Sequence, residues 1–334
     1  MKNKCLLSIK KIVLGFVFAI CFILSTYITS EASTYLVDYY DIAGRNRYET
    51  SYSIAKTTYP EGTTNAVIVN GNNFPDALSA TALAKKYDAP ILLVDDYREN
   101  DIKNILGELK IKNVYIVGGE GSVSSKIYGA INNMNEIELV NRIEGLNRYQ
   151  TNLAVIDEIF ESSSKAIIAT GANFPDALAI SPYAYKENIP LYLSGKIVTQ
   201  DTINHMKNKG VEKIIVVGDS GSIDSTLLKS SFGTSNVEVI QGADRYKTSQ
   251  TIFNKFYNAE TENIVWAKGD DFPDALSAIS LAGKKNTTIM LYRANFIDTK
   301  NSIDYQTTNR QHEDSADIKN QYITSIYNIW WDRL

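Results

Sequence analysis

The sequence predicts three α/β domains in tandem, each a three-layer unit built on a parallel sheet, with the third incomplete or atypical. Two repeated strings predict this organisation. Phe-Pro-Asp-Ala-Leu begins at Phe74, Phe174 and Phe272. Gly-x-(Asn/Asp)-Arg-Tyr-x-Thr begins at Gly44, Gly145 and Gly242. The two strings recur in step with a period of roughly a hundred residues, which exceeds the roughly 20 to 50 residues of a solenoid repeat and fits a small domain.

The first 32 residues predict a secretory signal peptide. Four lysines precede an apolar run at 12–24, and the small residues Ser30 and Ala32 suit a cleavage site. An uncleaved membrane anchor is the alternative, but the run is short for a membrane span. We therefore expect a secreted protein with no stable membrane anchor after cleavage. The expected domains after it are repeat 1 at 33–140, repeat 2 at 141–238, a partial repeat 3 at 239–297 and a divergent C-terminal tail at 298–334.

Composition limits the partners. Both cysteines, Cys5 and Cys21, lie in the signal segment, so the mature chain has no disulfide and must depend on hydrophobic cores, for which its 44% apolar content is adequate. The whole chain has 34 basic and 38 acidic residues, and removal of four lysines and one glutamate with the segment leaves 30 against 37. Such an acidic balance argues against broad binding to nucleic acid or anionic lipid. Any anionic ligand must be met by a few placed cations.

Short apolar runs rich in Val and Ile predict the strands of each unit. Their continuous apolar character predicts strands buried on both faces, with helices as crossover connections. The first unit has runs at 66–69, 90–94, 114–117 and 138–143, and the second has runs at 166–169, 190–193, 213–217 and 237–240. A tight turn is expected after the third strand of each, at Val117-Gly118-Gly119 and Val217-Gly218-Asp219.

The third unit begins in the same way, with runs at 264–267 and 288–292, and then departs. Ala316 stands where the other units have Gly118 and Gly218, so the second half is missing or rewritten. Ile318, Tyr322, Ile326 and Ile329 have the spacing of an amphipathic helix, with Trp330 and Trp331 as a final apolar plug.

The Phe-Pro-Asp string predicts a strand, a glycine turn and a helix start. We expect positive φ at the three glycines, proline in the first helical turn, the phenylalanines plugging the core, and the aspartates where the helix dipole favours negative charge. The glycines are Gly71, Gly171 and Gly269, and the aspartates are Asp76, Asp176 and Asp274. A loop that follows a parallel strand and opens a helix is the usual ligand edge of an α/β sheet.

The second string supplies one arginine and one tyrosine to each unit, which are Arg47, Tyr48, Arg148, Tyr149, Arg245 and Tyr246. Arginine has a planar fork of donors for carboxylate or phosphate, and tyrosine has a stacking face for a sugar. Two roles stay open for the arginines: pairing with an aspartate to brace the fold or a domain interface, and direct contact with ligand. These six residues and the three aspartates are our candidate polysaccharide-binding residues.

Catalytic residues are few. His205 and His312 are the two histidines, neither is repeated, and no metal site or cofactor is predicted. Glu120 and Asp219 could act as general acid or base, but an independent active site in each of three similar domains would be unusual. Gly118-Gly119-Glu120-Gly121 is a weak dinucleotide signal, because it follows the third strand of its unit and not the first. We therefore expect a protein that is not an enzyme.

At these motifs the chain resembles the type 2 cell-wall-binding repeat of clostridial and other Gram-positive surface proteins. The resemblance covers two complete repeats and about half of a third, from Asp41 to Tyr292. It implies three Rossmann-like domains around a pseudo-threefold axis, which hold a secreted protein at the cell wall by non-covalent binding of an anionic, teichoic-acid-like polysaccharide. Three weak sites would give avidity along a repeating polymer. The alternatives are an amidase-like cell wall hydrolase and a structural surface-layer component or adhesin that contacts other surface-layer proteins.

Overall fold

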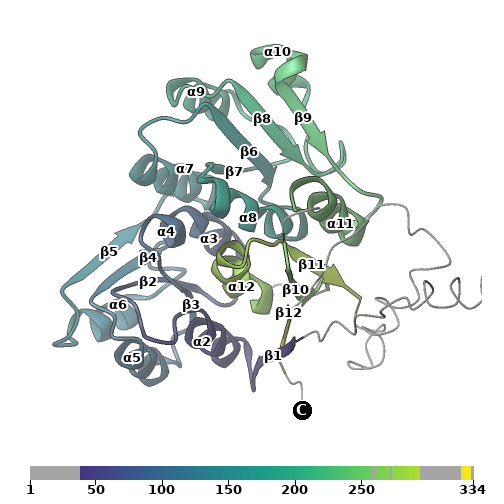
Figure 1. The fold of residues 1–334 in the computed structure, drawn as a ribbon. Helices are drawn as coiled ribbons and strands as arrows, with labels where there is room; N and C mark the ends of the chain where they lie inside the picture. The colour runs from purple at the N-terminus through teal and green to yellow at the C-terminus, as the bar shows by residue number, and fades with distance from the viewer. Residues whose placement is uncertain (1–37, 258–260, 271–272, 294–324, 332–334) are drawn as a thin grey trace, which may run out of the picture. The chain divides into compact units, whose positions relative to one another are not determined.

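The computed structural model describes residues 38–257, 261–270, 273–293 and 325–331 (Figure 1). The described residues belong to one compact unit, in which the strands form three four-stranded parallel sheets. The fold class predicted from the two strings is therefore confirmed. Among the described residues, no helix has the length and apolar character needed to cross a membrane. The predicted signal peptide, residues 1–32, lies outside the described residues.

The first sheet has the order β3-β2-β4-β5, with every neighbouring pair parallel. Its strands are β2 (Asn65–Asn70), β3 (Ile91–Val94), β4 (Asn113–Val117) and β5 (Leu139–Ile143). The connecting helices are α3 (Phe74–Ser79), α4 (Thr81–Lys86), α5 (Glu99–Glu108) and α6 (Ser125–Asn132). All four predicted runs form strands, and β2 and β3 are buried along most of their length, as continuous apolar character predicts.

The second sheet repeats this order as β7-β6-β8-β9. Its strands are β6 (Lys165–Thr170), β7 (Leu191–Ser194), β8 (Lys213–Val217) and β9 (Val237–Ile240). Its helices are α8 (Pro175–Glu187), α9 (Gln200–Asn208) and α10 (Thr226–Phe232), followed by a 3-10 turn at Thr234–Asn236. The four predicted runs of this unit are confirmed as strands.

The third sheet is assembled from distant parts of the chain. Its order is β1-β12-β10-β11, with β1 (Asp38–Gly44), β10 (Asn263–Lys268), β11 (Ile289–Tyr292) and β12 (Ser325–Trp331). Strand β12 pairs with β10 on one side and with β1 on the other, so the N-terminal strand takes the edge position that β5 and β9 hold in the other sheets. The prediction of an amphipathic helix is wrong for Ile326 and Ile329, which lie in β12, whereas Ile318 and Tyr322 lie outside the described residues.

Three further helices open the repeats: α2 (Arg47–Thr58), α7 (Arg148–Ile159) and α11 (Arg245–Phe256). The Asn or Asp of the second string caps each of them, because the side chains of Asn46, Asn147 and Asp244 accept hydrogen bonds from backbone amides of the first turn. Helix initiation therefore explains why Asn or Asp recurs at this position of the string.

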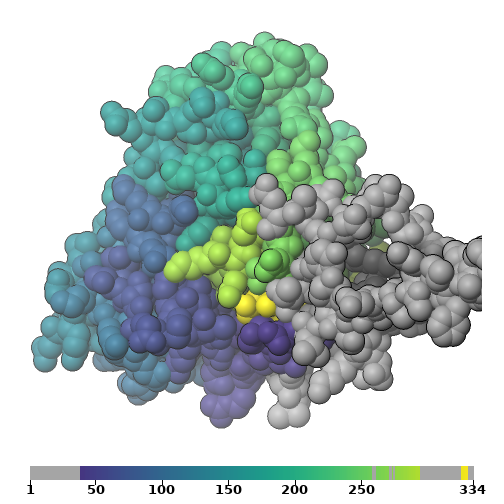
Figure 2. Space-filling model, viewed as in Figure 1, coloured from purple at the N-terminus to yellow at the C-terminus, as the bar shows by residue number. Residues whose placement is uncertain are grey.

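Contacts between the repeats recur in a cycle. The helices of the Phe-Pro-Asp strings contact the opening helix of the next repeat, as α3 with α7, α8 with α11, and α12 (Pro273–Lys284) with α2. In addition, α4, α8 and α12 contact one another. In Figure 2 the yellow-green residues of α12 lie between the purple first repeat and the teal and green second repeat. This cyclic pattern is the one expected for a pseudo-threefold arrangement.

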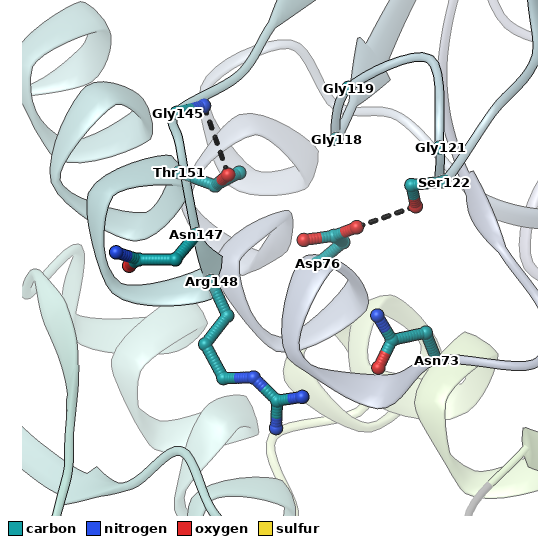
Figure 3. A pocket seen from close by; sticks show the side chains of 10 residues that line it. All are labelled: Asn73, Asp76, Gly118, Gly119, Gly121, Ser122, Gly145, Asn147, Arg148 and Thr151. Atoms are coloured by element: carbon teal, nitrogen blue, oxygen red, sulfur yellow. Dashed lines mark hydrogen bonds between the residues drawn. The ribbon is translucent and has the colours of Figure 1, made fainter.

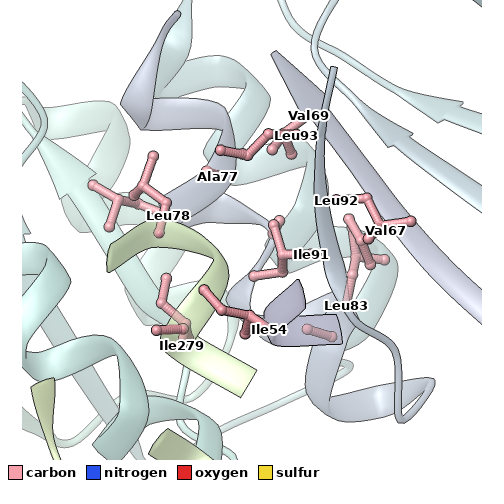
Figure 4. Packing of buried hydrophobic residues seen from close by; sticks show 14 of the residues in the cluster. Ile54, Val67, Val69, Ala77, Leu78, Leu83, Ile91, Leu92, Leu93 and Ile279 are labelled. Carbon is pink, nitrogen blue, oxygen red and sulfur yellow. The ribbon is translucent and has the colours of Figure 1, made fainter. Parts of the chain in front are cut away.

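One hydrophobic core runs through all three repeats. Figure 4 shows Ile54 of α2, Leu78 of α3 and Ile279 of α12 close to one another, and each is at most 1% exposed. Burial of such side chains is worth about 1.5–3 kcal/mol each. The repeats therefore stabilise one another through shared apolar surface as well as through their own sheets.

Candidate functional site

The first repeat has a cleft at the point where its strand order reverses. From β2 the chain passes first to β3 on one side and then to β4 on the other, so a crevice opens outside the carboxyl ends of β2 and β4. A cavity of about 360 Å³ lies there (Figure 3). It is lined by Asn73, Asp76, Gly118, Gly119, Gly121, Ser122, Gly145, Asn147, Arg148 and Thr151. We call it the first cleft, and its walls come from both the first and the second repeat.

The turn after β4 shapes one wall of the first cleft. Gly118 has φ +107°, a conformation that L-residues with a side chain rarely adopt. A β-carbon at Gly118 would also overlap the Asp76 carboxylate. The glycine thus lets the turn lie directly over the aspartate, and the tight turn predicted from the sequence is confirmed.

Asp76 is only 5% exposed, although its carboxylate lines the first cleft. Burial raises the pKa of the Asp76 carboxyl above its ordinary value, and a hydrogen bond from Ser122 and the charge of Arg148 oppose this rise. The Ser122 hydroxyl donates to Asp76 Oδ2 at 2.6 Å. In Figure 3 the other carboxylate oxygen points across the cleft, away from Ser122. It is placed to accept a hydrogen bond from a ligand.

The opposite wall comes from the start of the second repeat. Asn147 caps α7, and the Gly145 amide donates to Thr151 Oγ1 at 3.0 Å. Arg148 donates from Nη1 to the Gly171 carbonyl at 2.9 Å within its own repeat. Its guanidinium also lies 5.6 Å from the ring centroid of Phe74 in the first repeat. Arg148 therefore joins two repeats and still lines the cleft.

The other two arginines make the same bond to a strand-end glycine. Arg47 donates to the Gly71 carbonyl at 2.8 Å and Arg245 donates to the Gly269 carbonyl at 2.5 Å. The guanidinium of Arg245 lies 5.5 Å from the Phe174 ring, as Arg148 lies over Phe74. A bracing role is thus visible at all three positions. Each arginine remains partly exposed.

The tyrosines explain the strand-end glycines, and here the sequence interpretation was wrong. We expected positive φ at Gly71, Gly171 and Gly269, but none of them has it. Instead, a β-carbon would lie 2.6 Å from a ring carbon of Tyr48 at Gly71, 2.8 Å from Tyr149 at Gly171 and 2.5 Å from Tyr246 at Gly269. These glycines are required because a tyrosine ring lies against the backbone.

The phenylalanines agree in part with the expectation that each plugs the core beneath its turn. Phe174 is buried in the hydrophobic core, whereas Phe74 is partly buried and packs against that core. The rings of Phe74 and Phe174 lie edge to face, with centroids 6.2 Å apart, so they contact each other across the boundary between the first and second repeats. Phe272 lies outside the described residues.

The second repeat carries a related arrangement at its junction with the third. Gly218 has φ +119°, and a β-carbon there would lie 2.9 Å from Asp176 Oδ2. Burial and the charge of Asp219 raise the pKa of Asp176, whereas a hydrogen bond with Thr248 and the charge of Arg245 lower it. The Gly242 amide donates to Thr248 Oγ1 at 3.1 Å. These residues hold the places that line the first cleft, and for that correspondence alone we name this arrangement the second cleft. The side chain of Asp274 lies outside the described residues.

Sequence reasoning missed part of the lining. Ser122 and its counterpart Ser222 follow Gly121 and Gly221 in both complete repeats, and this recurrence could have identified them. Asn73 stands one residue before its phenylalanine and Asn173 does so in the second repeat, which is the same kind of signal.

The candidate catalytic residues are not brought together. His205 contacts the Tyr192 hydroxyl and an Asp157 carboxylate oxygen, each at 3.1 Å, and Glu120 accepts a hydrogen bond from Ser125 at 2.7 Å. Asp219 accepts a hydrogen bond from the Ser222 amide at 2.9 Å, and bonds with Ser222 lower the pKa of its carboxyl. Across the described ranges, no group of three or more His, Cys, Asp or Glu side chains could hold a metal ion. His312 lies outside the described residues.

A sequence model of the family described as Cell wall binding domain 2 matches residues 41–128, 142–228 and 239–326. Two curated proteins of Bacillus subtilis are similar to the chain. One is N-acetylmuramoyl-L-alanine amidase LytC, 34% identical over 260 residues, which are 77% of this chain and 51% of the amidase. The other is the Amidase enhancer, 31% identical over 252 residues, which are 75% of this chain and 34% of that protein. The chain thus spans about half of one relative and a third of the other.

Two solved structures from Clostridium difficile have a similar fold. Cwp6 superimposes with a TM-score of 0.72 and 29% identity, covering 91% of this chain and 48% of Cwp6. Cwp8 superimposes with a TM-score of 0.73 and 21% identity, covering 89% of this chain and 49% of Cwp8. The second similarity concerns the fold alone.

Proposed function

The chain belongs to the Cell wall binding domain 2 family, and we propose that it anchors itself to the Gram-positive wall, without catalysing a reaction, by non-covalent binding of an anionic, teichoic-acid-like polysaccharide. The observation that carries this proposal is the first cleft. It lies where α/β sheets usually bind ligands, and it combines a carboxylate acceptor, an arginine, two asparagines and a glycine-rich wall.

The chemistry of the first cleft suits a repeating unit that bears both hydroxyl and anionic groups. Asp76 presents an acceptor for sugar hydroxyl groups, and Arg148, Asn73 and Asn147 add donors. A volume of about 360 Å³ is at the lower end of small-molecule pockets, which fits a short piece of a polymer. Because the cations are few, we expect binding to show only modest sensitivity to salt.

The candidate residues contribute to this site in different ways. Asp76 and Arg148 line the first cleft directly, and Asp176 and Arg245 hold the corresponding places in the second cleft. Tyr48, Tyr149 and Tyr246 set the backbone at the strand ends, and we propose that they position the ligand edge. Arg47 and Asp274 are the matching residues for the junction of the third repeat with the first.

Retention on purified walls tests the proposal. The protein is mixed with Gram-positive walls that carry wall teichoic acid and with the same walls after the polymer has been stripped. We expect sedimentation with the intact walls and at least a tenfold loss on the stripped walls. Equal retention on both would contradict the proposal. Arg148→Lys, which keeps the charge but not the planar fork, should weaken retention more than Lys165→Ala, whose side chain is exposed and stands outside both strings.

The similarity to LytC makes an amidase-like hydrolase the alternative function. Loss of turbidity in a wall suspension would support it, and a stable suspension would support anchoring without catalysis. A role as a structural surface-layer component or adhesin would instead appear as binding to other surface proteins on walls that lack the polymer.

A further inference from the structure

The third sheet differs from the other two at the turn that covers the aspartate. Strand pairing identifies equivalent positions, because Val117 pairs with Ile143, Val217 pairs with Ile240, and Ile329 pairs with Ile42. The next residue is Gly118 in the first sheet and Gly218 in the second. In the third sheet it is Trp330.

The backbone also takes a different course there. After Val117 and Val217 the strand ends and the glycine turns with φ beyond +100°. After Ile329 the strand continues, and Trp330 and Trp331 pair with Ala43 and Gly44 of β1. Strand β12 therefore runs through the position at which the first two sheets form the wall of a cleft.

A tryptophan at this position is incompatible with the geometry of the first two clefts. A β-carbon at Gly118 would overlap Asp76, and one at Gly218 would lie 2.9 Å from Asp176 Oδ2, which is closer than real β-carbons approach. The glycine turns also position the residues that bond beside them. Ser122 donates to Asp76 in the first repeat, and Asp219 accepts from the Ser222 amide in the second. Among the residues that the structure describes, the third junction therefore has no glycine turn corresponding to the Gly118–Ser122 wall.

We propose that this chain binds the wall polymer at two junctions, the first and second clefts, and that the junction of the third repeat with the first is a structural closure made by β1 and β12. This inference rests on the proposed function and adds to it the number of polymer-binding sites. The ligand at each cleft is a hydroxyl-bearing repeating unit of the anionic polysaccharide. Two sites on one rigid body still give avidity along a polymer.

Two glycines allow the clefts to be blocked separately. Gly121 lines the first cleft, and a β-carbon added there meets nothing within 4 Å, so Gly121→Trp fills the cleft without a built-in clash. Gly221 is its counterpart, where a β-carbon meets only the end of the Asp219 side chain, at 3.2 Å. Gly107→Trp is the matched control, because Gly107 lies on α5, outside the cleft lining, and is equally open. Unchanged far-ultraviolet circular dichroism and urea midpoints verify that each variant folds.

Wall sedimentation then measures the apparent affinity of each variant. We expect Gly121→Trp and Gly221→Trp each to lower it at least tenfold, because loss of one of two linked sites removes avidity worth 10² to 10⁴. The double variant should lose polymer-dependent retention, and Gly107→Trp should bind as the parent does. Substantial polymer-dependent retention by the folded double variant would overturn the proposal, since it would require a third site.

A count of bound ligand supplies a second readout. The probe is a teichoic acid fragment of two or three repeating units, and native mass spectrometry gives the number bound at saturation. We expect two fragments for the parent, one for each single variant and none for the double variant. Three fragments on the parent would overturn the two-site inference while leaving the proposed function intact. No binding by the parent to fragments or to walls would instead contradict the proposed function.

Discussion

Gly118→Ala is the substitution that tests the architecture of the first cleft most directly. Alanine must adopt φ +107°, a strained conformation that costs about 1–3 kcal/mol. Its β-carbon must also displace the Asp76 carboxylate, and a weakened bond from Ser122 to this buried group costs a further 1–3 kcal/mol or so. We therefore expect a loss of about 2–6 kcal/mol in the free energy of unfolding, measured by urea denaturation.

Two further glycines separate these contributions. Gly210 has φ +76° but open space around it, so Gly210→Ala should show the backbone cost alone, about 1–2 kcal/mol. Gly121 has open space and no positive φ, so Gly121→Ala should stay within about 0.5 kcal/mol of the parent. If Gly118→Ala costs no more than Gly210→Ala, the close approach of the turn to Asp76 does not stabilise the protein and our account of the cleft is wrong.

Three other perturbations test different parts of the structure. Burial raises the folded-state pKa of Asp76 above 3.8, so the folded state holds that proton more tightly than the unfolded state does, and the free energy of unfolding should fall as the pH rises from about 4 through the folded pKa. Asp76→Asn should reduce this fall in urea titrations at several pH values. An unchanged dependence on pH would contradict the assignment to Asp76. Lys284 pairs with Asp88 of the first repeat at 2.7 Å and lies 4.0 Å from the Tyr59 ring centroid, so Lys284→Ala should lower the free energy of unfolding by about 1 kcal/mol. Lys103 pairs with Glu99 within α5, and Lys103→Ala should lower it by less in the same urea measurement. Ile42 of β1 is 5% exposed, so Ile42→Ala should lower the free energy of unfolding by about 2–4 kcal/mol in urea. The matched change Leu139→Ala, at an exposed position of β5, should stay within about 0.5 kcal/mol of the parent. Equal losses would contradict the pairing of β1 in the third sheet.

The sequence predicted the ten strands that lie within the three repeated units, because each is a short Val- and Ile-rich run between helical segments. It did not predict β1 or β12. In β1 only Ile42 is buried, and Ala43 and Gly44 are half-buried, so the strand has no continuous apolar run. Its partner β12 lies almost 290 residues away, and only pairing in three dimensions joins the two ends in one sheet.

The candidate site was predicted in part, for a similar reason. The two strings identified Asp76 and Arg148, and the ligand edge of the sheet followed from strand-loop-helix order. The strings did not show that the charge of Arg148 in one repeat acts on Asp76 of another, because that proximity depends on how the repeats pack. The sequence also did not show why glycine is required at position 71. The Tyr48 ring that lies against it belongs to a helix more than twenty residues earlier in the chain.

The most direct test of polymer binding between the repeats is a nuclear magnetic resonance titration of the labelled protein with teichoic acid fragments of two or three repeating units. We predict that backbone amide shifts concentrate at Gly119, Gly121 and Asn147 around the first cleft, with a second group around Gly221. Saturable shifts confined to other surfaces, such as helices α5 and α9, with the cleft amides unmoved, would contradict this account.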